Sequence, residues 1–211
     1  MSRPVVYLGP SLPVEEARAL LDAEYRPPVK RGDLSALGPA EVVGIIDGAF
    51  LQNCSVGHRE ILSLLSRGVK VIGGGSMGAL RAAEMQAYGM IGVGRIFQMY
   101  ADGVIEGDDE VALVFDPASM EPLSEPMVNL RFLMDKMLKE GKVSAGEHHG
   151  ILSSYRSIYY PRRTIAAFLD TSEKFLGEER GRVFRQDFPI LYQDVKREDA
   201  ISVIKRIGEL V

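Results

Sequence analysis

The glycine-rich run Gly73-Gly74-Gly75-Ser76-Met77-Gly78 is the strongest local constraint on how this chain can fold. It follows an apolar run at residues 69–72, typical of a short buried strand, and leads into an alanine-rich stretch at residues 77–88, typical of a helix. Glycines at such a position allow the chain to reverse sharply and allow the helix to approach the strand with no side chains between them. The run therefore predicts a strand–turn–helix unit.

The rest of the first half also alternates strand-like and helix-like segments. Strands are expected at residues 4–8, 25–29 and 42–47, and helices at residues 13–21 and 56–65. Pro27 and Pro28 confine the second of these strands to an edge of the sheet, and residues 105–115 are expected to hold a last extended segment. Because alternating strands and helices favour right-handed βαβ units, we predict an α/β fold with a parallel, Rossmann-like sheet in the N-terminal half.

The pattern changes near residue 117, where prolines at 117, 122 and 126 punctuate a connecting stretch. Beyond it the apolar spacing predicts helices at residues 127–138, 145–158, 164–169, 173–184 and 198–207. We therefore predict an α/β core over residues 1–118 and an all-helical region over residues 119–211. The helical region is either a second domain or part of the same compact unit.

Composition narrows the class of protein. The chain has 211 residues, of which 46% are hydrophobic and 26% are charged, and its net charge is −4, so we expect a globular protein that does not bind nucleic acid. No apolar run is long enough to cross a bilayer, and the single cysteine, Cys54, is natural in a reducing compartment. We expect a cytoplasmic protein with no membrane contact.

Two known patterns coincide in the glycine-rich run. The spacing Gly73-x-Gly75-x-x-Gly78 matches a dinucleotide-binding fingerprint, and Gly74-x-Ser76-x-Gly78 matches a nucleophile elbow. A third interpretation is a structural turn in which Ser76 caps the helix. The dinucleotide is disfavoured, because the fingerprint belongs on the first strand and an acid-tipped strand should follow about 20 residues later. Here a second glycine-rich stretch follows instead, at residues 88–94.

The elbow interpretation requires a base, and His58 is the one histidine in the first half of the chain. It lies in the first turn of the helix expected after the strand at residues 42–47, and Asp47 ends that strand. Ligands bind at the carboxyl edge of a parallel sheet, so Ser76, His58 and Asp47 are the candidate catalytic residues, with Asp47 orienting His58. The alternative is a histidine that caps its local loop.

Backbone N–H groups at the same edge are candidates for binding an anion or a developing oxyanion. They belong to the helix start and to the loop after Asp47, namely Gly48, Gly74, Gly75, Met77 and Gly78. Arg81 and Glu84 lie three residues apart and share a face of the expected helix. They form either an intrahelical ion pair or a binding site in which Arg81 lies beside a carboxylate or thiocarboxylate.

Three further residues are accessory candidates. Cys54, in the loop before His58, can supply a nucleophilic thiolate, and Asp108 and Asp109 can supply oxygen ligands to Mg²⁺. For Cys54 we favour a cysteine with no functional role, and for Asp108 and Asp109 we favour an exposed acidic turn. Three histidines and one cysteine also argue against a zinc cluster, so we expect no metal and no cofactor.

A resemblance to a known family runs through these residues. It is carried by Asp47-Gly48-Ala49-Phe50, His58-Arg59-Glu60-Ile61-Leu62, Gly75-Ser76-Met77-Gly78-Ala79-Leu80-Arg81-Ala82-Ala83-Glu84, Gly89-Met90-x-Gly92-x-Gly94 and Asp108-Asp109-Glu110-Val111-Ala112. In this order, these blocks strongly resemble the TfuA-like family. The opening Tyr7-Leu8-Gly9-Pro10-Ser11 is similar to the start of that family, whereas Cys54 departs from its pattern.

The resemblance implies a role beside YcaO enzymes in forming backbone thioamides in peptides or proteins, as in RiPP biosynthesis. A TfuA-like partner is expected to recruit a ThiS-type sulfur-carrier protein and to hydrolyse its C-terminal thiocarboxylate. Ser76 would then attack or orient water, His58 would transfer the proton, and Arg81 would offset the negative charge. The alternative is a non-catalytic adaptor or allosteric activator that docks the carrier or the YcaO enzyme. A generic esterase or nucleotide binder has less support, and homo-oligomer formation is left open.

Overall fold

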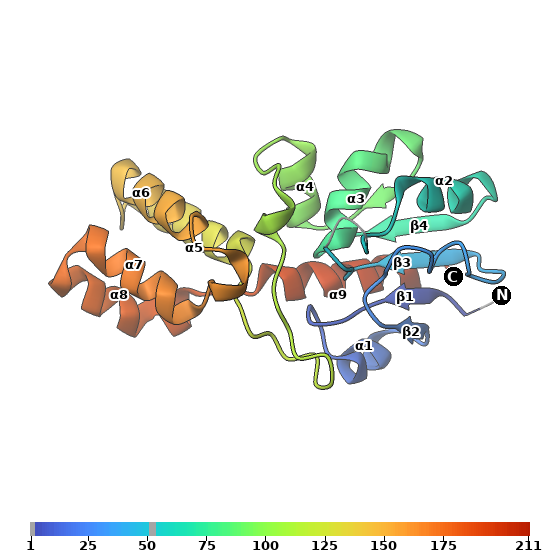
Figure 1. Ribbon diagram of the computed structural model, residues 1–211, viewed down its shortest axis with the longest axis horizontal. Coiled ribbons are helices and arrows are strands. Elements are labelled where there is room, and N and C mark those ends of the chain that lie inside the picture. The colour runs from blue at the N-terminus through green and yellow to red at the C-terminus, as the bar shows by residue number, and fades with distance from the viewer. Residues whose placement is uncertain (1–2, 51–53) are drawn as a thin grey trace. The chain divides into compact units, whose positions relative to one another are not determined.

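The chain folds into two compact units. The computed structural model describes residues 3–50 and 54–211. The first unit, called here the sheet unit, comprises Met1–Asp108 and Val195–Val211, and the second, called the helical unit, comprises Asp109–Asp194 (Figure 1). The predicted helical region, residues 119–211, is therefore divided, because its last helix returns to the sheet unit.

The sheet unit is built on a parallel sheet of five strands in the order β2-β1-β3-β4-β5. The strands are β1 (Val5–Tyr7), β2 (Glu24–Arg26), β3 (Val42–Ile45), β4 (Lys70–Gly73) and β5 (Ile91–Gly92), and each neighbouring pair is parallel. The predicted α/β fold with a parallel sheet is confirmed, and β2 is an edge strand as expected. The strand order reverses between β1 and β3, the place where open parallel sheets bind their ligands.

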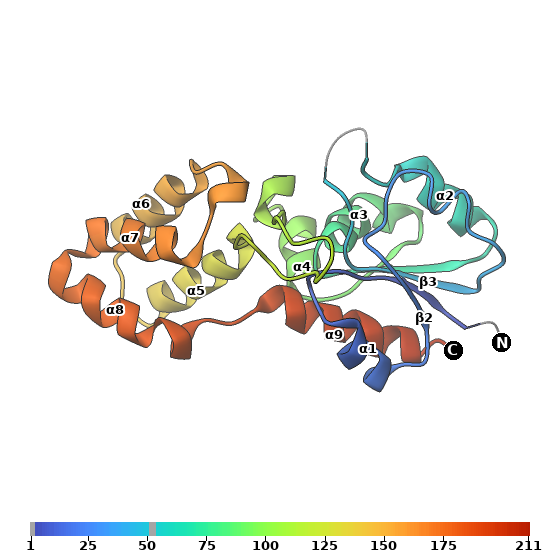
Figure 2. The same ribbon diagram turned by 60° about the horizontal axis from the view of Figure 1, so that its bottom comes forward.

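Helices cover both faces of this sheet. Helices α2 (His58–Ser66) and α3 (Met77–Met85) pack on one face, where the core contains Val5, Val43 and Val71. Helices α1 (Val14–Leu20) and α9 (Val195–Gly208) pack on the other face, where the core contains Val6, Val42 and Ile72. Successive strand residues point to opposite faces, so β1 contributes Val5 to one core and Val6 to the other. Figure 2 shows α1 and α9 side by side beneath the strands.

Two short elements of the sheet unit were not expected from the sequence. Strand β5 has two residues, and it is followed by α4 (Arg95–Ala101). Gly94 precedes α4 with a φ of 98°, a backbone angle that favours glycine. The extended segment predicted at residues 105–115 is wrong. The chain forms a 3-10 turn, η2 (Asp108–Glu110), and a single antiparallel bridge joins Phe115 to Pro122.

The helical unit contains α5 (Met127–Lys139), α6 (Ala145–Arg156), α7 (Ile165–Leu176) and α8 (Glu178–Leu191), with the short turn η3 (Tyr160–Arg162) before α7. Its apolar core includes a group of aromatic rings, in which Tyr155 and Phe168 pack edge to face at 5.3 Å between centroids. Gly177, with a φ of 79°, separates α7 from α8. In the described part of the chain, no helix is both long and apolar enough to span a membrane.

Candidate functional site

The glycine-rich turn between β4 and α3 is tightly packed. A Cβ atom on Gly78 would lie 1.7 Å from the carbonyl oxygen of Ile45, and one on Gly73 would lie 2.3 Å from the carbonyl oxygen of Gly78. Gly75 has a φ of 74°, in the left-handed region. The glycines are therefore required by the close approach of α3 to β3 and by the reversal of the chain.

The C-terminal helix α9 covers this turn. A Cβ on Gly74 would lie 2.6 Å from the Cγ2 atom of Val203, and one on Gly75 would lie 3.4 Å from the carbonyl oxygen of Lys196. Ser76 is only 1% exposed, and Lys196 is also buried. Sequence reasoning missed this contact, because α9 lies more than one hundred residues away along the chain and carries no recognisable motif.

Backbone N–H groups of Gly74, Ser76 and Gly78 in the turn donate hydrogen bonds within the fold. The N–H of Gly78 donates to the carbonyl oxygen of Ile46 at 3.1 Å, and that of Ser76 donates to the carbonyl oxygen of Gly74 at 2.8 Å. Ser76 occupies the N-cap position of α3, but its hydroxyl makes no capping hydrogen bond. Gly48 packs against the same helix start, since a Cβ there would lie 2.8 Å from the Cγ of Met77. The turn is thus closed by its own packing.

Asp47 lies at the reversal of strand order and supports the loop after β1. Its carboxylate accepts hydrogen bonds from the N–H of Gly9 at 2.9 Å, the N–H of Ser11 at 3.1 Å and the Ser11 hydroxyl at 2.7 Å. The side chain is buried, with the residue 3% exposed. Asp47 therefore connects β3 to the β1 loop, and the predicted contact with His58 is replaced by these bonds.

His58 is instead paired with Glu84. The Nε2 atom of His58 lies 2.8 Å from Oε2 of Glu84, and the same oxygen accepts a hydrogen bond from Nη1 of Arg81 at 2.6 Å. Arg81 also donates through Nε to the carbonyl oxygen of Val56 at 3.1 Å, which joins α3 to the residues before α2. We call His58, Glu84 and Arg81 the histidine cluster.

The histidine cluster differs from the glycine turn in exposure and in position. The His58 side chain is 51% exposed, whereas that of Arg81 is 12% exposed. Glu84 lies eight residues after Ser76, which corresponds to about 12 Å along the axis of α3. The hydrogen bonds therefore join His58 to Glu84 and Arg81. Asp47 is bonded instead to the loop after β1, and Ser76 is buried in the glycine-rich turn. The i, i+3 spacing of Arg81 and Glu84 was the sequence signal for this pairing.

The accessory candidates lie in different places. Cys54 is exposed, and its carbonyl oxygen accepts a hydrogen bond from the N–H of Arg31 at 2.8 Å. Asp108 is exposed at the end of the first segment of the sheet unit. Asp109 accepts a hydrogen bond from Nη2 of the buried Arg163 at 2.7 Å.

The neighbouring acid Glu110 is buried and pairs with Arg131 at 2.6 Å. The acidic run therefore supplies ion pairs that hold the start of the helical unit to its helices. Among the described residues, no group of three or more His, Cys, Asp and Glu side chains could hold a metal ion.

Comparison with protein families places the chain in a class. The sequence profile of the family described as TfuA-like protein matches residues 47–164, more than half of the 211 residues. The chain belongs to the TfuA-like family, as the resemblance in its motifs predicted. The matched range begins at Asp47 and includes the whole histidine cluster. The TfuA-like family is linked to YcaO-associated systems. No curated protein matches the chain.

Proposed function

We propose that this protein hydrolyses the C-terminal thiocarboxylate of a ThiS-type sulfur carrier and supplies the sulfide to a YcaO enzyme. One observation carries the proposal: a half-exposed histidine, His58, lies 2.8 Å from a carboxylate that is itself held by a guanidinium. A histidine fixed by a carboxylate is a common arrangement for transferring protons near neutral pH. Family membership supplies the substrate class.

The reaction consumes one water molecule. His58 takes a proton from the water, the resulting hydroxide attacks the carbonyl carbon, and the carbon–sulfur bond breaks. One proton returns from His58 to the departing sulfur, and the newly formed carboxylic acid gives up its proton to the hydrosulfide, so that thiocarboxylate and water give carboxylate and hydrogen sulfide. Glu84 holds the imidazole in place and stabilises its cationic form.

Arg81 is assigned to charge compensation. A thiocarboxylate is an anion and resists attack by hydroxide, so a nearby cation lowers the barrier. Two of the three nitrogens of Arg81 are used in the bonds to Glu84 and Val56. The third nitrogen, Nη2, has no partner among the described residues, and the proposal gives it the role of donor toward the substrate. The proposal assigns the attack to water because Ser76 is buried. Ser76 and the glycines shape the sheet edge.

A sulfide-release assay with purified protein and thiocarboxylated carrier tests the proposal. His58→Ala removes the proton acceptor, and we expect release to fall about a hundredfold or more. Glu84→Gln should cost about tenfold, because the imidazole cation loses its partner, while Ser76→Ala should stay near wild type. All variants are compared at equal folded concentration, established by circular dichroism. Release by His58→Ala at the wild-type rate would refute the mechanism.

The burial of Ser76 and the closed turn favour one alternative, a non-catalytic adaptor that docks the carrier or activates the YcaO enzyme. The same assay separates the two functions. An adaptor alone releases no sulfide from the carrier, and it increases thioamide formation only when the YcaO enzyme is present. In that case His58→Ala would weaken binding of the carrier and leave no hydrolysis to lose.

A further inference from the structure

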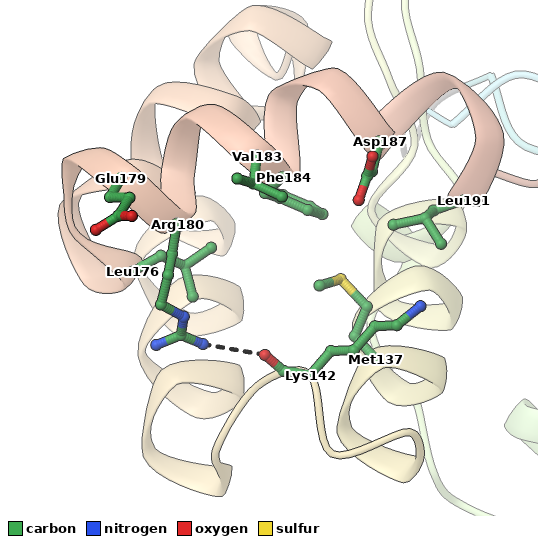
Figure 3. Close-up of a pocket in the computed structure, with 9 residues that line it drawn as sticks. All are labelled: Met137, Lys142, Leu176, Glu179, Arg180, Val183, Phe184, Asp187 and Leu191. Atoms are coloured by element: carbon green, nitrogen blue, oxygen red, sulfur yellow. Dashed lines mark hydrogen bonds between the residues drawn. The ribbon is translucent and has the colours of Figure 1, made fainter.

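The helical unit contains a hollow of about 340 Å³ that the proposed hydrolysis does not use. Figure 3 shows α8 along one side of it and Met137 with Lys142 on the other. The apolar lining includes Met137, Leu176 and Phe184, all buried, whereas Val183 on α8 is 52% exposed. A volume at the small end of the range for ligand sites fits inserted apolar side chains better than a large cofactor.

The charged side chains that line this hollow differ in whether they have ion-pair partners. Its two cations have partners, since Arg180 pairs with Glu147 and Lys142 pairs with Glu140 at 2.7 Å. Its two carboxylates, on Glu179 and Asp187, make no hydrogen bond or ion pair with any residue that the structure describes. The mouth of the hollow therefore presents uncompensated negative charge beside an apolar interior.

The spacing of these groups along α8 is regular. Glu179, Val183 and Asp187 are separated by four residues each, so they lie on one face of the helix and extend over about 12 Å. Ile190, 83% exposed, continues the apolar stripe in the next turn. An acidic, apolar, acidic, apolar order on one face, next to a hollow, has the pattern of a surface that receives an amphipathic helix.

We infer that this face of α8 is a docking surface for a basic amphipathic helix of a partner protein. The partner inserts an apolar side chain into the hollow beside Val183. It carries a lysine or arginine four residues before and four residues after that side chain, which places the two cations opposite Glu179 and Asp187. Charge complementarity selects this occupant, because the unpaired groups at the mouth are both carboxylates.

A fluorescently labelled alanine-based helical peptide tests the inference with the full-length protein. The peptide carries one leucine with lysines four residues to either side, and a second peptide carries glutamates in place of the lysines. We expect saturable binding of the lysine peptide only. The variant with both Glu179→Lys and Asp187→Lys should bind the lysine peptide about tenfold or more weakly and should bind the glutamate peptide instead.

Glu121→Lys is the matched control for the single variant Asp187→Lys, because it makes the same change of charge at an exposed position in the loop before α5. It should bind the lysine peptide like wild type. Equal binding of both peptides, or equal weakening by Glu121→Lys and Asp187→Lys, would overturn the inference. Sedimentation analysis tests whether a second copy of the chain occupies the surface instead. Self-association that Asp187→Lys abolishes would assign the surface to a second copy and would also overturn the inference.

Discussion

The glycine turn lies at the start of helix α3 and Glu84 of the histidine cluster lies near its end, and the two regions differ in burial and in role. At the start of α3, the turn is buried under α9, its glycines are needed for close packing, and the N–H groups of Gly74, Ser76 and Gly78 donate hydrogen bonds within the fold. At the end of α3, Glu84 holds the half-exposed His58. The glycine-rich motif thus serves the fold, while His58 and Glu84, the side chains proposed for proton transfer, are exposed to solvent.

This contrast shows why two sequence patterns can fit the same residues. Fingerprint glycines and elbow glycines are both selected by close approach of a helix to a strand. In this chain that approach is between Gly78 and the carbonyl oxygen of Ile45. A glycine motif of this kind therefore indicates close packing of a helix on a strand, and it does not by itself indicate a reaction. Assigning a reaction to it requires an accessible reacting group nearby, and Ser76 is almost fully buried.

The contrast predicts that the largest loss of stability comes from the turn. Gly78→Ala places a Cβ 1.7 Å from a backbone oxygen that cannot move without distorting β3. We expect it to lower the free energy of unfolding by about 4 kcal/mol or more, beyond ordinary overpacking. Chemical denaturation measures this loss. Gly38→Ala is the control, because no atom lies within 4 Å of the added Cβ, and it should be near neutral. Equal effects of the two variants would contradict the assigned role of Gly78.

Asp47 provides the next largest effect and separates support from catalysis. Asp47→Ala leaves the N–H groups of Gly9 and Ser11 without their acceptor in a buried place, which should cost about 3 kcal/mol. Asp47→Asn should cost less, because one oxygen still accepts. Sulfide release per folded molecule should be unchanged in both variants. A loss of release as large as that of His58→Ala, at equal folded concentration, would return Asp47 to the catalytic site.

Substitution of Asp199 should give the smallest loss of stability, and it tests the packing of α9 over the glycine turn. Its carboxylate accepts hydrogen bonds from the N–H groups of Arg95 and Ile96, so it fastens α9 to the start of α4. Burial raises the pKa of Asp199, although these two N–H groups act in the opposite direction. We expect Asp199→Asn to cost only about 1 kcal/mol, because the variant avoids the burial of a charge.

The raised pKa of Asp199 also fixes a pH dependence. A carboxyl whose folded-state pKa is raised contributes stability while it is protonated, and this contribution is lost as the pH rises from the ordinary aspartate value of about 4. The stability advantage of wild type over Asp199→Asn should therefore shrink between pH 4 and pH 7. Denaturation series at the two pH values measure it, and an advantage that grows with pH would contradict the assignment.

Much of the sheet unit could be predicted from local sequence. The apolar runs around Val6, Val43 and Val71 are long enough to indicate buried strands, and their alternation with helices fixes a parallel sheet. Strand β5 could not be found this way, because it has two residues and one of them is Gly92. Nor could the break between α7 and α8, since Gly177 interrupts a pattern whose apolar spacing continues on both sides.

The residues of the candidate site could be predicted from the sequence, and so could the pairing of Arg81 with Glu84 within α3, but the partner of His58 could not. His58, Arg81 and Glu84 were all identified as candidates from the sequence. The expected partner of His58, however, was Asp47, the acidic residue at the end of the preceding strand. Which carboxylate meets an imidazole depends on how α2 and α3 lie side by side, and periodicity within each helix does not contain that information. The cover provided by Lys196 and Val203 depends on contacts across the length of the chain and had no local signal.

The division of the sheet unit into two segments has a consequence for the order of synthesis. On the ribosome, residues 109–194 are synthesised before Val195–Val211, so the sequence of the helical unit is complete before that of the sheet unit. Until α9 arrives, Val6, Val42 and Ile72 lack the apolar side chains that cover them in the finished protein. While its helical unit is being synthesised, the nascent chain therefore exposes an apolar sheet face that residues 195–211 later cover.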